Sequence, residues 1–253
     1  MAYESVSSTE LGEILSQFLF SIDFYMPPFE YDFSLEEPVM SHFRHQLWPE
    51  AHSAKALKMA KWISGIGMCY PFADQDTQVA CGIHGVYVLL VDDLTKELGQ
   101  SMDHFATNII LGRPQESSIL QSLTDWLPYT SAYQGPFATD MTIKSAIDFI
   151  RGCIVERDFD GKLIPPYGAV NFPNYFRSKT GIAEPFAHFC FPERLYPESE
   201  YLHIYLPALQ DICDFINHPN DILLFYKETV VGTERLTYIP NFAHTYGWLM
   251  RIQ

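Results

Sequence analysis

The stretch Gly85-Val-Tyr-Val-Leu-Leu-Val-Asp-Asp93 decides between two fold classes. Its apolar part, residues 85–91, is rich in β-branched side chains, and such a run fits either a buried parallel strand or a buried helix. A strand ending at Asp92 would suggest an α/β phosphatase with an aspartate nucleophile. That fold needs further strands alternating with helices, and we find no other segment with this pattern. The stretch therefore predicts a buried helix.

The segments on both sides of this stretch carry apolar residues at the spacing of an amphipathic helix. Over residues 10–24 they recur every three or four positions, at Leu11, Ile14, Leu15, Phe18 and Ile22. The same spacing occurs over residues 54–69, 116–127, 141–156 and 201–217. Proline favours a helix start, so Pro219 predicts a separate helix over residues 220–229. We expect an all-α protein of about ten helices, folded as a single domain over residues 1–253.

The composition describes a globular and strongly acidic protein. Of its 253 residues, 47% are hydrophobic and 19% are charged, and the net charge is −15. A surface this negative repels nucleic acid and anionic membranes, and an anionic small substrate would need metal cations to bind. The five cysteines form no Cys-x-x-Cys pair, and the chain shows neither a secretory signal nor an apolar run of about 18 residues. We therefore expect a cytoplasmic protein with free thiols and no membrane span.

The first acidic cluster is VDDLTKE, residues 91–97, directly after the apolar stretch. Asp92 and Asp93 would lie at the polar end of the buried helix, and Asp93 shares a helix face with Glu97. Oxygen ligands beside an apolar cavity suit Mg²⁺, which retains waters and bridges to substrate phosphates. A solvated helix end is the alternative interpretation.

The second cluster is NDILLFYKE, residues 220–228. In a helix, Asn220, Leu224 and Glu228 fall at i, i+4 and i+8, along one line. An amide oxygen and a carboxylate on that line could hold a cation, and Lys227 could contact a phosphate. The alternative is an amphipathic helix capped by Asn220.

Together, the two clusters resemble the motifs of class I terpene synthases, specifically the fungal trichodiene synthase family. That family has an aspartate-rich helix followed by an Asn-Asp-x-x-Ser-x-x-x-Glu helix. The segments QGPF (134–137), IRGCIVE (150–156) and NYFRSKTG (174–181) also resemble the family in order and spacing. The resemblance implies a helical bundle around a central apolar cavity. It also implies a lyase that ionises farnesyl diphosphate with Mg²⁺, cyclises the carbocation to a sesquiterpene and releases diphosphate.

The resemblance assigns metal ligands to both clusters. Asp92 matches the principal Mg²⁺ ligand, and Asn220 and Glu228 match the outer ligands of the second motif. Glu97 is the carboxylate nearest to a further acidic position of the family. The resemblance implies three Mg²⁺ ions, but the middle ligand of the second motif, normally Ser or Thr, is Leu224 here, which puts the third ion in doubt.

The resemblance also assigns contacts to the substrate. Arg177 matches an arginine that senses the diphosphate, and its planar charged fork suits that group. Lys227 matches a lysine that meets the same diphosphate. Gly181 matches a helix-breaking position whose carbonyl faces the developing cation. Tyr87 matches a pocket aromatic, with an ordinary core position as the alternative.

Three departures from the family pattern keep a second function open. Leu224 replaces a ligand, Lys96 stands where the family often has an acid, and the chain ends at Gln253 without the Arg-Tyr pair of later helices. We therefore expect a bundle lacking the last helices of the family. The alternative function is an inactive, truncated member that binds an isoprenoid diphosphate or a protein partner. The family also forms homodimers, so a homodimer is a further expectation.

Overall fold

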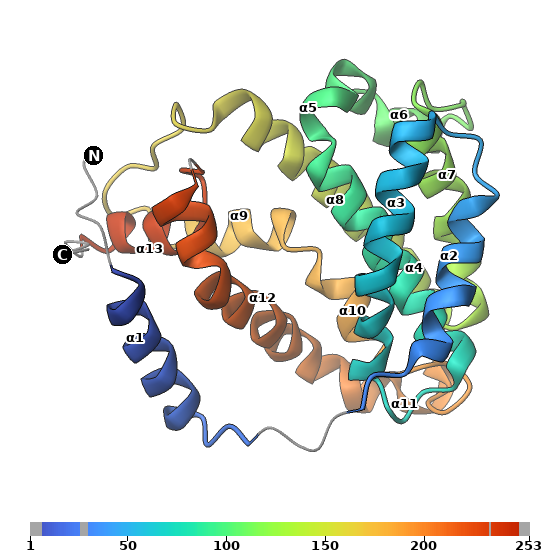
Figure 1. The fold of residues 1–253 in the computed structure, drawn as a ribbon, viewed down its shortest axis with the longest axis horizontal. Coiled ribbons are helices and arrows are strands. Elements are labelled where there is room, and N and C mark those ends of the chain that lie inside the picture. Colours follow the sequence, from blue (N-terminus) through green and yellow to red (C-terminus); the bar gives the residue numbers. More distant parts are fainter. Residues whose placement is uncertain (1–6, 26–29, 233, 248–253) are drawn as a thin grey trace.

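The computed structural model describes residues 7–25, 30–232 and 234–247, and all regular structure within these ranges is helical (Figure 1). The α-helices are α1 Ser8–Ser21, α2 Glu36–Arg44, α3 Glu50–Ile63, α4 Gln75–Asp93, α5 Thr95–Leu98, α6 Phe105–Ile110, α7 Ser118–Trp126, α8 Pro136–Phe159, α9 Phe172–Thr180, α10 Ala183–His188, α11 Glu198–Tyr205, α12 Leu209–Phe225 and α13 Tyr238–Thr245. Short 3₁₀ segments are η1 Phe33–Leu35, η2 Ser64–Cys69, η3 Gly99–Met102, η4 Leu127–Ala132 and η5 Leu206–Ala208, and η6 Tyr226–Val231 is a π-helix. The predicted all-α class is confirmed.

The stretch at residues 85–93 is the C-terminal half of the buried helix α4, as predicted. The helix begins after Asp74, whose side chain accepts a hydrogen bond from the Thr77 amide at 2.9 Å. Such a cap satisfies one of the free amides of a helix start. A Cβ at Gly85 would lie 2.8 Å from Ile63 Cγ2, so the glycine lets α3 approach closely. Figure 1 shows α2 to α7 on one side of the molecule and α9, α12 and α13 on the other, with α8 between them.

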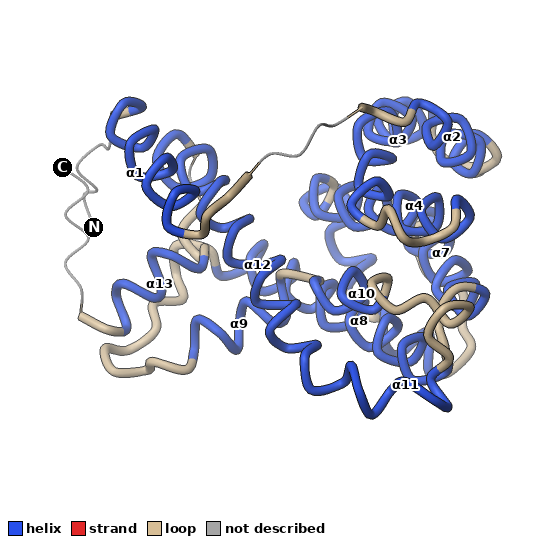
Figure 2. Tube along the Cα trace, turned by 90° about the horizontal axis from the view of Figure 1, so that it is seen from below, coloured by secondary structure: helices blue, strands red, loops and turns tan. Residues whose placement is uncertain are grey.

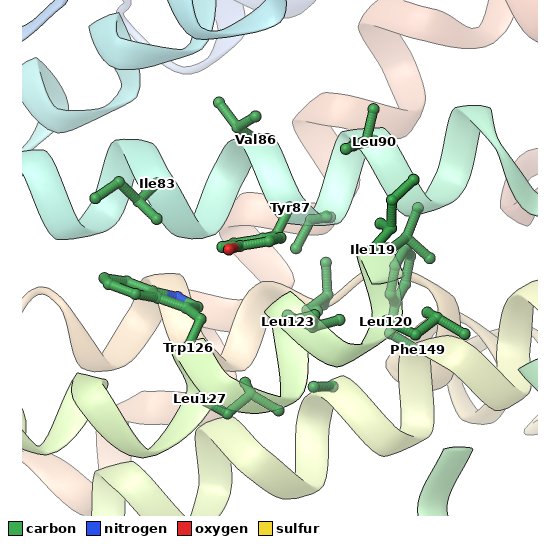
Figure 3. Close-up of a cluster of buried hydrophobic side chains, with 14 of the residues drawn as sticks. Ile83, Val86, Tyr87, Leu90, Ile119, Leu120, Leu123, Trp126, Leu127 and Phe149 are labelled. Carbon is green, nitrogen blue, oxygen red and sulfur yellow. The ribbon is translucent and has the colours of Figure 1, made fainter. Parts of the chain in front are cut away.

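The largest apolar cluster lies between α4, α7 and α8 (Figure 3). Tyr87 is at its centre with no exposed surface, and its ring stacks on Trp126 at 6.3 Å between centroids. The Tyr87 hydroxyl forms a 2.9 Å hydrogen bond with His42 Nε2. A buried hydroxyl without a hydrogen-bond partner would destabilise the folded state, and this pairing avoids that cost. Tyr87 therefore has the core position that was the alternative to a pocket role.

Helix α8 is the longest helix that the structure describes, and it begins at Pro136. The Glu198 carboxylate accepts hydrogen bonds from the Phe137 and Ala138 amides, both at 2.8 Å. A negative group at a helix start satisfies free amides and opposes the positive end of the helix dipole. Figure 2 shows α8 running between the two sides of the molecule.

Two predicted helix boundaries are wrong. Residues 54–69 are α-helical only to Ile63, because η2 comes so close to α4 that a Cβ at Gly67 would lie 2.5 Å from the Gln78 carbonyl oxygen. Pro219 does not begin a helix but lies inside α12, which continues to Phe225. Packing of α12 against α10 and α13 supports the helix where the proline removes a hydrogen bond. Among the described helices, none combines the length and apolar character needed to cross a membrane.

Candidate functional site

Asp92 lies at the end of α4 beside two residues of α8. Ligand atoms of Asp92, Cys153 and Glu156 all lie within 4.8 Å of one another. The two carboxylates are 64 residues apart in the sequence, and only the packing of α4 near α8 brings them together. Neither carboxylate forms an ion pair with a residue in the described ranges. The arrangement therefore concentrates negative charge.

The protein environment raises the pKa of both carboxyl groups. Asp92 reaches solvent, yet the surrounding protein removes enough water to raise its pKa to about 6, and the charges of Asp93 and Glu234 add to this. Loss of water also raises the pKa of Glu156 to about 8, with further repulsion from Asp92 and Glu234. Such perturbed carboxylates mark candidate functional sites.

Arg177 on α9 contacts the second motif at the end of α12. Its Nε donates to Asp221 Oδ2 at 3.0 Å, and a terminal nitrogen donates to Asn220 Oδ1 at 3.1 Å. The same side chain forms a 2.9 Å ion pair with Asp221 Oδ1. Arg177 and Asn220, a predicted diphosphate contact and a predicted metal ligand, are thus adjacent, although 43 residues separate them. Burial raises the pKa of Asp221, and the Arg177 charge opposes that rise.

The last residues of the second motif, 226–228, lie on the π-helix η6. Residues advance by a smaller angle in a π-helix than in an α-helix, so Glu228 does not continue the single α-helical line that was predicted from Asn220. Loss of water and the nearby Glu234 raise the pKa of Glu228 to about 7. The positive charges of Lys227 and Arg177 lower it, and the same two charges also act on Asp92. The same positive charges therefore act on a carboxylate of each motif.

A loop after η6 supplies an acidic residue that the motifs do not contain. Glu234 follows η6, and its amide donates to the Glu228 carbonyl oxygen at 3.3 Å. The Asp160 carboxylate anchors the loop by accepting hydrogen bonds from the Arg235 and Leu236 amides, both at 2.8 Å. The Glu234 charge acts on Asp92, Glu156 and Glu228 alike.

Two carboxylates of the first motif point elsewhere. Glu97 forms a 3.2 Å contact with His52, and Asp93 forms a 3.1 Å ion pair with Lys55. Both partners lie on α3. The structure therefore does not bring Glu97 together with Asp92 and Glu156.

Gly181 lies at a break between two helices, as expected. The α9 helix ends at Thr180 and α10 begins at Ala183, with Ile182 in a left-handed conformation at φ 43°. A Cβ at Gly181 would lie 2.8 Å from Asn217 Cγ and would clash with the amide oxygen. The glycine thus permits close contact between this break and α12.

Three acidic residues at the site were not singled out from the sequence. Glu156 could have been, because it follows Phe149 and Cys153 at helical spacing and so places an acid on the apolar face of α8. Asp221 is adjacent to Asn220 but was not assigned a separate role. Glu234 lies in a loop, where no periodicity indicates the direction of a side chain.

Comparison with known proteins identifies a matching family and several relatives. The family model described as Trichodiene synthase (TRI5) matches residues 52–252. An (E)-beta farnesene synthase from Metarhizium brunneum is 36% identical over 235 residues, which cover 92% of this chain and 70% of the relative. A trichodiene synthase from Trichoderma arundinaceum is 25% identical over 203 residues, 79% of this chain and 50% of the relative.

A third relative covers nearly the whole chain. Monoterpene synthase 25 from Postia placenta is 25% identical over 251 residues, 96% of this chain and 72% of the relative. The chain spans only about half the length of the trichodiene synthase. The match over residues 52–252 contains both acidic clusters and Arg177. The chain belongs to the trichodiene synthase family.

Proposed function

We propose that this chain is a Mg²⁺-dependent terpene synthase that ionises farnesyl diphosphate and cyclises the resulting carbocation. The observation that carries the proposal is the position of Arg177, which is bonded to Asn220 and Asp221 within the electrostatic reach of Asp92 and Glu228. A diphosphate needs cationic groups around it, and an acidic protein can supply them by binding metal ions. The terpene synthase names of the relatives support the same reaction class.

The donor set fits a hard divalent cation. Asp92 and Glu156 offer carboxylate oxygens close together, and loss of water, followed by repulsion from neighbouring carboxylates, raises the pKa of both groups. Mg²⁺ prefers oxygen ligands of this kind. Burial holds the pKa of the Cys153 thiol well above its usual range, so it stays protonated and is no ligand.

We assign two cations, one to each of two groups of residues. Asp92 and Glu156 would hold one from α4 and α8, and Asn220 and Glu228 would hold the other. Leu224 offers no ligand atom, so we assign no third ion. Bound Mg²⁺ would supply Lewis-acid stabilisation of the leaving diphosphate.

Arg177 and Lys227 bind the leaving group in this proposal. The Arg177 fork now pairs with Asp221 and Asn220, and the diphosphate would replace one of these partners. Bidentate hydrogen bonds from arginine suit phosphate oxygens. Lys227 is exposed on η6 and adds a second positive charge. The two side chains together would hold the diphosphate while the allylic C–O bond breaks.

One feature favours a second candidate function. Leu224 lies where a hydroxyl ligand would complete the second motif, and its loss would weaken metal binding on that side. The second candidate is therefore a member that binds an isoprenoid diphosphate without ionising it.

The assay uses the purified chain with farnesyl diphosphate and MgCl₂. Diphosphate release and hydrocarbon products are measured together, the latter by gas chromatography with mass spectrometry. Replacing Asp92 by Asn or Arg177 by Gln should lower the rate about 10²–10³-fold. Asp140→Asn, at an exposed position of the same helix as Glu156, is the matched control and should leave the rate unchanged.

Each outcome of the assay has a separate meaning. Full activity in both site variants would refute the proposed site. Binding of farnesyl diphosphate with Mg²⁺, but no release of diphosphate, would establish the second candidate.

A Glu97→Gln variant tests the first-motif residue that pairs with His52, and we expect an unchanged dependence of the rate on Mg²⁺ concentration.

A further inference from the structure

A concave region lies beside the N-terminal half of α8, away from Glu156 near the C-terminal end of that helix. It is an open groove of about 550 Å³ with a mostly apolar surface. Ile109 of α6, Leu127 and Pro128 of η4, and Ile143 of α8 form its apolar walls. Pockets that bind small organic molecules have volumes of about 300–1,000 Å³ and mostly apolar walls. Figure 1 shows α6 and α7 together at this end of the molecule.

The loop at the edge of the groove is held in place by hydrogen bonds. The Arg113 amide donates to the Asn108 carbonyl oxygen at 2.8 Å. The Gln115 amide donates to Gln121 Oε1 at 2.7 Å, and the Gln115 side chain donates to the Phe105 carbonyl oxygen at 3.2 Å. Gly112 permits the turn with a left-handed φ of 61°. These bonds fix the backbone from which the exposed Arg113 side chain extends beside the groove.

Arg113 is an exposed cation on a strongly acidic protein. Among the residues that the structure describes, it forms no ion pair, whereas Arg44, Arg157 and Arg194 each pair with a carboxylate. With a net charge of −15, the chain has many acids that could have paired with it. An arginine beside an apolar groove offers a planar fork to an anionic group.

The other polar side chains of the groove, Asn108, Gln121 and Thr124, bond to protein atoms, and the Asn108 amide donates to Gln115 Oε1 at 3.5 Å. Gln121 donates to Asp125 at 2.7 Å and accepts from the Gln115 amide. The Thr124 hydroxyl donates to the Leu120 carbonyl oxygen at 2.9 Å. The recognition chemistry of the groove is thus one cation and an apolar surface.

We propose that this groove binds an amphipathic small molecule with an apolar body and one anionic head, either a carboxylate or a phosphate. The apolar body would lie against Ile109, Leu127 and Ile143, and the head would pair with Arg113. Burying the apolar body contributes about 25 cal/mol per Å² of surface removed from water. The Arg113 contact selects the anion over a neutral analogue of the same shape.

The groove acts independently of the acidic site. Ile143 precedes Glu156 by 13 residues on the continuous helix α8, a separation of about 20 Å at the helical rise. A chelator removes the metal ions that the proposed synthase site would use to hold an anionic head. Arg177 and Lys227 remain at that site, so the methyl resonances described below are needed to assign the binding to the groove.

The experiment measures binding by titration calorimetry in EDTA. The probes are decanoate and decyl phosphate, both kept below the concentrations at which they form micelles, with decanol and inorganic phosphate as controls. We expect one molecule bound per chain, and Arg113→Gln should weaken binding about tenfold or more through the lost charge-assisted hydrogen bonds. Lys58→Gln removes one positive charge at an exposed position on α3 and should leave the affinity unchanged.

The location of binding is read from the methyl resonances of labelled isoleucine. Decanoate should shift the resonances of Ile109 and Ile143, and a comparison of decanoate with decyl phosphate identifies the preferred head. Equal affinity in Arg113→Gln, or equally tight binding of decanol, would overturn the proposal. Methyl shifts confined to other isoleucines would also overturn it. Shifts that depend on protein concentration instead of decanoate would assign the groove to self-association and refute the small-molecule site.

Discussion

Replacing Glu156 by Gln should make the metal-free protein more stable than the wild type, and this difference should grow as the pH rises. The pKa of Glu156 is raised from 4.5 to about 8. The folded state therefore keeps a proton that the unfolded state has lost, and folding becomes less favourable as the pH rises from 4.5 to 8. Glutamine has the same shape and no charge, so the variant lacks this penalty. Because the structure shows no hydrogen bond from the Glu156 side chain to a described residue, the change breaks none of those contacts.

The size of the effect follows from the pKa shift. For one such group, the free energy of unfolding of the wild-type chain falls by about 1.4 kcal/mol for each pH unit in this range. At pH 7 the wild-type chain should be about 3 kcal/mol less stable than Glu156→Gln, and above pH 8.5 about 5 kcal/mol less stable. Near pH 4.5 the two proteins should unfold at similar urea concentrations. These values are upper bounds, because relaxation and water entry reduce the repulsion between Glu156 and Asp92.

The assay is urea unfolding in EDTA at several pH values between 4.5 and 8.5, followed by far-ultraviolet circular dichroism. Asp140→Asn removes one carboxylate at an exposed position of the same helix and serves as the control, with no growing difference expected. A constant difference between wild type and Glu156→Gln across this range would refute the electrostatic reasoning.

Three further predictions concern stability. Burial lowers the pKa of His84 and His188 to about 4, so unfolding takes up protons and stability should fall between pH 6.5 and 4, by up to about 3 kcal/mol per ring. Urea midpoints of a His84→Leu variant should decline less steeply over this range than those of the wild type. Gly181→Ala should lower the thermal midpoint, because its Cβ would meet Asn217, and Asn217→Ala in the same chain should restore part of the loss. Pro219→Ala should raise the midpoint, since proline inside a helix costs about 3 kcal/mol relative to alanine, and an unchanged or lower midpoint would contradict this.

The helical class could be predicted because apolar periodicity is local information. The spacing of Leu11 to Ile22 and the lack of a second strand-like segment were enough to predict an all-α protein. The boundaries were less predictable, since tertiary contacts determine them. Residues 54–69 change to a 3₁₀ segment where Gly67 meets α4, and packing continues α12 through Pro219. Both outcomes depend on neighbours that are remote in the sequence.

The site was predictable where its residues form a motif. The family resemblance singled out Arg177 as a diphosphate contact and Asn220 as a metal ligand, and the structure places a hydrogen bond between them. Glu97 was predicted as a ligand because it is the carboxylate nearest to a further acidic position of the family, but in the structure it contacts His52 of α3. Glu234 joins the site through a loop anchored by Asp160, and no local pattern predicts such a contact.

The two sides of the site differ in how their helices are built. Asp92 and Glu156 lie on the continuous helices α4 and α8, which contribute to the large apolar cluster. Arg177, Asn220 and Glu228 lie next to a helix break, an internal proline and a π-helix, where the backbone is interrupted. Amide hydrogens in a well-packed core exchange with solvent only when the whole protein unfolds, whereas interrupted segments exchange through local opening. Deuterium should therefore enter η6 and the α9–α10 break long before it enters α4, and a ligand held between the two sides would slow exchange mainly on the interrupted side.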